Sequence, residues 1–303
     1  MQKDEHIHLL KPDVINSVKG LLLIAKVIVD RFYQGHHGSK KIAPGMEFSQ
    51  YRNYEAGDDL RLLDWKMLAR SGRYYIRQAD QDANIEVKFV IDTSASMLHE
   101  GRFTNKLDYA KVLIASLGYL SNSQGDEIGL YALNDHTNIN FYPKTGKQHF
   151  NRFLQQLVLL DAKGKWPDSN NVTKELHSRG NKELIIFLTD FYESNNELFN
   201  FLKELKTLRN EVIVFHLLSN DELHMQNKGV VTFEDMESGK RIKVDTKTYS
   251  EEYQKRMDEN IRSYMNALNE KGIKYHYIDM DANLSEVIQL FLNQRNKLGK
   301  CSF

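Results

Sequence analysis

Cysteine is nearly absent from this chain of 303 residues, which has one, Cys301. A lone cysteine excludes an internal disulfide and a cysteine-rich zinc site, and it fits a reducing compartment such as the cytoplasm. A charge excess is also absent, because 41 basic residues balance 41 acidic ones. Since nucleic-acid binding requires a clustered basic excess to neutralise phosphates, this balance argues against a nucleic-acid-binding protein.

Long apolar runs are missing as well. The N-terminal residues include acids, and no small-residue cleavage site follows an apolar core, so we expect no secretory signal. The most apolar window, Gly20 to Val29, is interrupted by Lys26 and is much shorter than the ~20 residues needed to cross a bilayer. Its apolar side chains recur at helical spacing. This pattern predicts an amphipathic helix from Asp13 to Tyr33 that packs on protein, with attachment to a membrane surface as the alternative.

The most informative stretch runs from Ile85 to Met97, with the sequence IEVKFVIDTSASM. Its β-branched and nearly continuous apolar residues predict a strand buried on both faces of a parallel sheet. Asp92, Ser94 and Ser96 follow at the carboxyl end, where open α/β sheets place their sites. One charged and two neutral oxygens at alternate positions suit Mg²⁺ or another divalent cation. The alternative is an ordinary turn capped by Asp92.

The Asp-Thr-Ser-Ala-Ser sequence resembles the DxSxS motif of the metal-ion-dependent adhesion site (MIDAS) in von Willebrand factor A domains. A second apolar strand, Leu184 to Leu188, ends in Thr189-Asp190, where that family places another acidic ligand. The resemblance therefore implies a metal site that includes Asp92, Ser94, Ser96 and Asp190. The family takes one more oxygen from a Thr in a neighbouring loop. This chain offers Asp168, Ser169 or Thr173 there, and we prefer Ser169.

Residues 35–84 differ from the rest of the chain in being rich in Arg, Asp and aromatic residues. This run, from Gly45-Met46-Glu47-Phe48 to Ala69-Arg70, resembles the signature of a bacterial family called domain of unknown function 58 (DUF58). In that family a similar block precedes a von Willebrand-type domain. No helical period runs through the segment, so we expect an irregular arm.

Ion pairs around Trp65 and neighbouring tyrosines are expected to clamp this arm onto the domain, and a partner-binding surface is the alternative. The residues concerned are Arg52, Asp58, Asp59, Arg61, Asp64, Trp65 and Arg70.

Downstream of the DxSxS motif, apolar strands alternate with amphipathic helices. This order predicts an α/β fold with a doubly wound, mostly parallel sheet over residues 85–297, after the N-terminal helix (1–34) and the arm (35–84). The resemblance implies six strands with one antiparallel edge, a von Willebrand A or Rossmann-like arrangement. Val230 to Phe233 and Arg241 to Val244 flank a glycine turn and predict a surface hairpin inserted near residues 228–246. We expect a long helix to begin at Ser250 and the last helix to span Leu284 to Leu292.

Motifs of common hydrolases are missing, including a phosphate-binding loop, a GxSxG elbow and HExxH. A haloacid-dehalogenase motif would need Asp where Ser94 stands. We therefore expect a non-enzymatic, metal-dependent protein-interaction module whose cation accepts an acidic residue of a partner. The alternative is a phosphatase-like, metal-dependent hydrolase that uses Asp92 and Asp190. DUF58 proteins commonly occur beside AAA+ ATPases of the MoxR class, so the resemblance implies an adaptor that links such an ATPase to a client.

Overall fold

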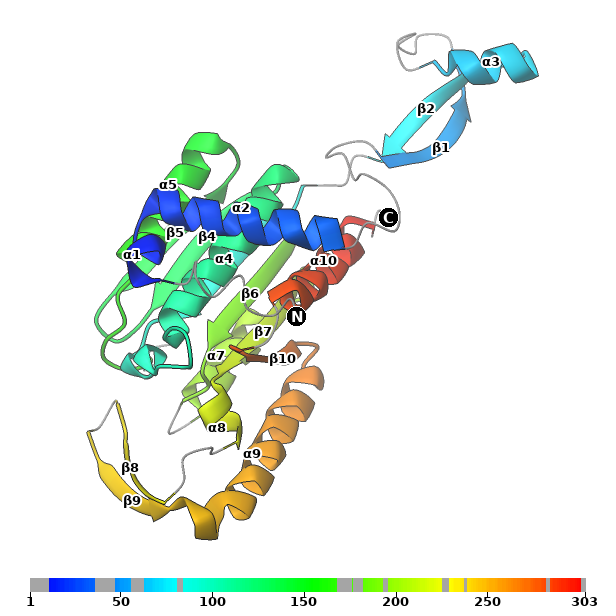
Figure 1. Cartoon of the computed structure of the whole chain (residues 1–303). Helices are drawn as coiled ribbons and strands as arrows, with labels where there is room; N and C mark the ends of the chain where they lie inside the picture. The colour runs from blue at the N-terminus through cyan, green and yellow to red at the C-terminus, as the bar shows by residue number, and fades with distance from the viewer. Residues whose placement is uncertain are drawn as a thin grey trace.

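The structure, a computed structural model, describes residues 11–35, 47–55, 63–80, 84–167, 176, 182–192, 196–224, 229–236, 239–281 and 284–300. The described residues form a central six-stranded sheet in the order β10-β7-β6-β3-β4-β5 (Figure 1). Its strands are β3 (Glu86–Asp92), β4 (Glu127–Leu133), β5 (Asn138–Lys144), β6 (Glu183–Thr189), β7 (Asn210–Leu218) and β10 (Lys274–Asp279).

Neighbouring strands of this sheet run parallel except at one edge, where β5 pairs antiparallel with β4. The chain passes from β3 outward to β4 and β5, and then crosses to β6, β7 and β10 on the other side of β3. The carboxyl ends of β3 and β6 therefore flank the point at which the winding reverses, which is where such sheets place their sites. The predicted doubly wound, mostly parallel sheet is confirmed.

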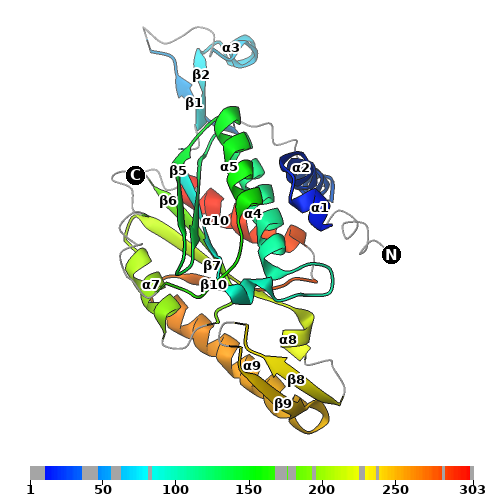
Figure 2. The same ribbon diagram turned by 90° about the vertical axis from the view of Figure 1, so that its left-hand side faces the viewer.

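Helices cover both faces of the sheet (Figure 2). One face carries α1 (Pro12–Ile15), α2 (Val18–Gly35), α4 (Lys106–Ser123), α5 (Lys147–Leu159) and α10 (Leu284–Lys300), and the other carries α7 (Glu197–Leu205) and the end of α9 (Thr246–Asn269). Strand residues alternate between the two cores, with Phe89 and Ile186 in the first and Val90 and Phe187 in the second. Burial on both faces explains why these strands are apolar almost throughout.

The N-terminal segment folds as two helices, so the single helix predicted from Asp13 to Tyr33 is wrong. Ser17 interrupts it, because its Oγ accepts a hydrogen bond from the Gly20 N–H at 3.1 Å and so caps α2. The apolar face of α2, which includes Leu21, Ile24 and Ile28, is buried in the core beside α4. Its predicted packing on protein is confirmed. No helix among the described residues has the length and apolar character needed to cross a membrane.

Residues 35–84 are regular where the structure describes them. β1 (Glu47–Asn53) pairs antiparallel with β2 (Tyr75–Asp80), and α3 (Trp65–Ser71) lies between them in the sequence. Asp64 caps α3, since its Oδ1 accepts hydrogen bonds from the N–H groups of Lys66 and Met67 at 2.9 and 3.0 Å. The expectation of an irregular arm is wrong for the described residues. Two strands pair here although the sequence lacks the alternation of apolar residues from which strands are usually predicted.

The predicted hairpin is present between β7 and β10, formed by β8 (Val230–Glu234) and β9 (Arg241–Asp245). α9 follows β9 directly and begins at Thr246, before the predicted start at Ser250. A short helix, α8 (Asn220–His224), precedes the hairpin and was not predicted. The hairpin, α8 and the start of α9 lie beyond the carboxyl edge of the sheet (Figure 1).

The last helix, α10, continues eight residues beyond its predicted end at Leu292, to Lys300. Arg295 holds this extension to the sheet, since its guanidinium donates to both carboxylate oxygens of Asp126 at 2.6 and 3.1 Å. Such a paired contact links distant parts of the chain, so the local sequence pattern did not reveal it.

Candidate metal centre

Asp92 lies at the centre of a hydrogen-bonded cluster at the end of β3. Its side chain is fully buried, and Oδ1 accepts a hydrogen bond from the Ser94 N–H at 2.9 Å. Oδ2 accepts from the Thr189 hydroxyl, at the end of β6, also at 2.9 Å. The short 3-10 helix η3 (Ala95–Leu98) turns Ser96 back, and its Oγ lies 2.9 Å from that of Ser94. The structure thus brings Asp92, Ser94 and Ser96 together.

Asp190 joins this cluster from the neighbouring strand. β3 and β6 run parallel and side by side, so the residues at their carboxyl ends share one edge of the sheet. The nearby Ser96 hydroxyl helps to lower the pKa of the Asp190 carboxylate, and Asp190 Oδ1 accepts a hydrogen bond from the Tyr192 N–H at 3.2 Å. Two carboxylates and two serine hydroxyls therefore converge on one small region.

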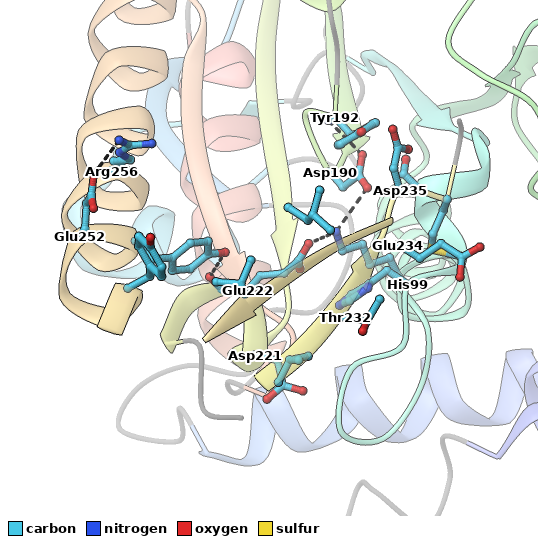
Figure 3. Close-up of a pocket in the computed structure, with 18 residues that line it drawn as sticks. His99, Asp190, Tyr192, Asp221, Glu222, Thr232, Glu234, Asp235, Glu252 and Arg256 are labelled. Atoms are coloured by element: carbon cyan, nitrogen blue, oxygen red, sulfur yellow. Dashed lines mark hydrogen bonds and ion pairs between the residues drawn. The ribbon is translucent and has the colours of Figure 1, made fainter. Parts of the chain in front are cut away.

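Lys106 also belongs to the centre, although sequence reasoning missed it. It is the first residue of α4, whose cap, Asn105, accepts a hydrogen bond from the Asp108 N–H at 2.7 Å. The Lys106 side chain is 2% exposed, and its Nζ lies 3.3 Å from Asp190 Oδ2 and 2.7 Å from Glu222 Oε1 (Figure 3). Its position just after the DxSxS turn was the available signal. The sequence carried no comparable signal for Glu222, because α8 is brought to the site only by the tertiary fold.

The two carboxylates of the centre differ in their preferred charge. Burial, and then the neighbouring Asp190 carboxylate, raise the pKa of Asp92 to about 7. Burial also acts to raise the pKa of Asp190, but Lys106 and the hydrogen bond from Tyr192 hold it below its usual range. Burial acts to lower the pKa of Lys106, while Asp190 and Glu222 raise it to a net value above normal. In the absence of a further cation, Asp190 and Lys106 are charged and Asp92 binds a proton near neutral pH.

The donor set fits a hard divalent cation. Carboxylate and hydroxyl oxygens are the ligands that Mg²⁺ prefers, and a cation beside Asp92 would favour its ionised form at a site where burial opposes it. Within the described part of the chain, no group of three or more His, Cys, Asp and Glu side chains is arranged to hold a metal. The candidate centre therefore depends on the serine hydroxyls as well as on Asp92 and Asp190.

A second loop supports the DxSxS turn. Lys163 N–H donates to the Thr93 carbonyl at 2.9 Å, and Ala95 N–H donates to the Gly164 carbonyl at 3.0 Å. Gly164 has a φ of +68°, and a Cβ there would lie 1.9 Å from Asp135 Oδ1, so the turn requires glycine. The loop continues toward the remaining proposed ligands, which lie outside the described residues. These are Asp168, Ser169 and Thr173.

The charged residues proposed for the arm are placed only in part. Asp58, Asp59 and Arg61 lie outside the described residues, and Arg52 is described only as a position in β1.

Of the others, Asp64 is buried as the cap of α3, and Arg70 lies in the last turn of that helix. Trp65 is 63% exposed. The expected ion-pair network around it stays a prediction, because Asp58, Asp59 and Arg61 lie outside the described residues. The first turn of α3 directs Asp64 inward and Trp65 outward.

The strand order, the antiparallel edge and the acidic turn at the switch point define a von Willebrand A-like α/β domain with a candidate metal centre. A family model described as "Protein of unknown function DUF58" matches residues 50–263, and the chain belongs to that family.

The chain is similar to the uncharacterized proteins Mb1516 of Mycobacterium bovis and Rv1480 of Mycobacterium tuberculosis. Each is 25% identical over 235 residues, which cover 75% of this chain and 72% of the relative. Among solved structures, the conserved hypothetical protein BatB from Bacteroides thetaiotaomicron has a TM-score of 0.45 at 14% identity, covering 71% of this chain and 100% of its own. The SpRpn10 VWA domain has a TM-score of 0.41 at 12% identity, with coverage of 69% and 95%. Neither similarity carries an argument about function.

Proposed function

We propose that this protein is a non-enzymatic, metal-dependent protein-interaction module, in which Asp92, Ser94, Ser96 and Asp190 hold Mg²⁺ or another divalent cation. The convergence of these side chains at the switch point between β3 and β6 is the observation that carries the proposal. A cation bound there supplies a positive centre that accepts a carboxylate oxygen from a partner. Lys106 already neutralises Asp190, so the ion keeps much of its charge for that partner.

The residues of the chain hold the centre in position. The Ser94 N–H and the Thr189 hydroxyl each bond one oxygen of Asp92, which fixes the plane of the carboxylate. Thr189 is thereby a positioning residue that couples the ends of β3 and β6. The Ser96 hydroxyl lies 2.9 Å from the Ser94 hydroxyl, and the bond from Thr189 to Asp92 connects the ends of β3 and β6, so the site is held from both strands.

Lys106 is unsuited to act as the general base of a hydrolase. A general base must be able to take up a proton, whereas Lys106 is charged and bonded to Asp190 and Glu222. Incubation of the protein with para-nitrophenyl phosphate and Mg²⁺ tests the phosphatase-like alternative. We expect no turnover above that of the Asp92→Asn variant. Turnover that depends on Asp92 would favour the hydrolase.

We further propose that the module is a cytoplasmic adaptor between a MoxR-class AAA+ ATPase and a client, with membership of the DUF58 family as support. The test is affinity capture from native bacterial cytosol with tagged full-length protein, in Mg²⁺ and in chelator. We expect the ATPase and client to be retained only with Mg²⁺, and to be lost with Asp92→Ala, Ser94→Ala or Asp190→Ala.

Because these three residues act on one ion, combining the substitutions should add little to the loss from each alone. Asp258→Asn, an exposed acid on α9, is the matched control and should leave capture unchanged. A native partner whose retention is indifferent to chelator and to Asp92→Ala would contradict the proposal.

A further inference from the structure

The β8–β9 hairpin, α8 and the first half of α9 enclose a cleft beside the metal centre (Figure 3). Its volume is about 800 Å³, within the range of ligand-binding sites, and it extends to Ser96 and Asp190. The Tyr253 hydroxyl on α9 donates to the Glu222 carbonyl on α8 at 2.8 Å. This bond connects two walls of the cleft, and Glu222 in turn connects them to Lys106.

Apolar side chains on the hairpin and α9 form one wall of this cleft. Among them, Ile242 is 62% exposed, Tyr249 is 51% exposed and Met236 is 45% exposed. Val231, Val244 and Tyr253 extend the same wall. Apolar side chains gathered and exposed in this way are characteristic of a binding surface, because leaving them in water is unfavourable.

The charge around the cleft is acidic. Six carboxylates line it against two cationic side chains, although the whole chain has a net charge of zero. Both cations are bonded to carboxylates, Lys106 as described above and Arg256 to Glu252 Oε1 at 2.6 Å. Asp221 lies on α8, and Glu234 lies on β8, where it is paired with Arg241 of β9 at 2.9 Å (Figure 3). The negative field is therefore local, and it favours a positively charged ligand.

We propose that this cleft binds a segment of a partner protein in which basic side chains stand next to apolar ones. The apolar side chains would cover Ile242, Met236 and Tyr249, while the basic ones would pair with Asp221 and neighbouring carboxylates that line the cleft. This inference goes beyond the proposed function, because the apolar side chains of the cleft and Asp221 are not part of the proposed metal site. A partner held here would lie directly beside the metal centre.

Fluorescence anisotropy with labelled eight-residue peptides tests the proposal on the full-length protein. The probe alternates lysine with leucine, and two controls alternate glutamate with leucine and lysine with serine. We expect only the lysine–leucine peptide to bind, and to bind more weakly as salt is raised. Ile242→Ser and Asp221→Asn should each weaken binding by roughly tenfold, equivalent to about 1.4 kcal/mol.

Matched variants outside the cleft, Leu159→Ser on α5 and Asp258→Asn on α9, should bind the peptide as the wild type does. Asp92→Asn should abolish stabilisation by Mg²⁺ and keep peptide binding, which separates this inference from the proposed function. Equal binding of the glutamate–leucine peptide, or unchanged binding by both cleft variants, would overturn the proposal. The proposal would also be overturned if the protein bound no peptide but self-associated, and if Ile242→Ser abolished that self-association. The occupant of the cleft would then be a second copy of the chain.

Discussion

Nζ of Lys106 lies 3.3 Å from Oδ2 of Asp190, so a buried lysine neutralises one of the two carboxylates of the candidate metal centre. This pair decides which carboxylate is charged in the metal-free protein. Asp190 is ionised beside Lys106, whereas Asp92 faces Asp190 without a cation of comparable influence on its pKa. The centre therefore contains one built-in cation, the Lys106 ammonium, and a second position beside Asp92 that suits a metal cation.

The Lys106→Gln variant should bind Mg²⁺ more tightly than the wild type, and its metal-free form should be less stable. The interaction energy of two unit charges 4 Å apart is about 4 kcal/mol at an effective dielectric of 20. Removing the repulsion between the ammonium and the ion should therefore tighten Mg²⁺ binding by at least about tenfold. Loss of a partner from a buried pair costs about 3–5 kcal/mol of unfolding free energy. Isothermal titration calorimetry and chemical denaturation measure the two effects.

The control for this variant is Lys111→Gln on the same helix. Lys111 is also buried, and its Nζ lies 3.3 Å from Asp108 Oδ1, away from the metal centre. Its replacement should lower stability and leave Mg²⁺ affinity unchanged. Weaker Mg²⁺ binding by Lys106→Gln would show that the lysine supports the metal site instead of competing with the ion.

Mg²⁺ should stabilise the folded protein by mass action. A ligand that binds only the folded state adds about 2.7 kcal/mol to the free energy of unfolding at a hundredfold excess over its dissociation constant. Thermal melts with Mg²⁺ and with chelator measure this, and Asp92→Asn should show no difference between them. An unchanged midpoint at millimolar Mg²⁺, in protein first shown to be metal-free, would count against the site.

The stabilisation by Mg²⁺ should be larger at pH 8 than at pH 6. In the metal-free fold the pKa of Asp92 is raised from 3.8 to about 7. Its favourable contribution to stability is therefore complete below about pH 4 and is lost as pH rises through about 7. Mg²⁺ requires the ionised carboxylate and must displace that proton at pH 6.

The measurement is the shift in melting temperature on adding Mg²⁺ across this pH range. Burial lowers the pKa of His216 to about 4. Its titration affects melts with and without Mg²⁺ alike, so its effect largely cancels in the difference between them. A shift of equal size at pH 6 and pH 8 would place the ion away from Asp92.

Packing of α2 should be a large contribution to stability. Ile24 is 1% exposed, so Ile24→Ala should lower the free energy of unfolding by about 2–5 kcal/mol. Its neighbour Leu23 is mostly exposed, and Leu23→Ala should change the free energy of unfolding by less than about 0.5 kcal/mol. Urea denaturation gives both values. Flotation of the full-length protein with liposomes, lost on deleting residues 1–34, would instead support a membrane role for this segment.

The cap of α3 should have a local effect only. Asp64→Ala removes the acceptor for two backbone N–H groups and should cost about 1 kcal/mol of local helix stability. Hydrogen exchange should show faster opening of α3, with Mg²⁺ affinity unchanged. A loss of Mg²⁺ binding in this variant would reveal coupling between the arm and the metal centre.

The sequence by itself determined those features that depend on neighbouring residues. Apolar runs identified β3 and β6, because strands buried on both faces are apolar over most of their length. The acid at the end of each strand then followed from the parallel topology, which aligns carboxyl ends at one edge. The cap of α4 is equally local, since the hydrogen bond from the Asp108 N–H to Asn105 spans only three residues.

Only the tertiary structure decided which distant side chains share the centre and what covers it. Lys106 meets Glu222 across 116 positions in the sequence, and no local pattern encodes that contact. The hairpin from Val230 to Asp245 was predicted as a surface feature, yet its place beside Ser96 and Asp190 depends on α8 and α9. The pKa of Asp92 likewise results from burial and from Asp190, because desolvation and charge proximity are properties of the packed fold.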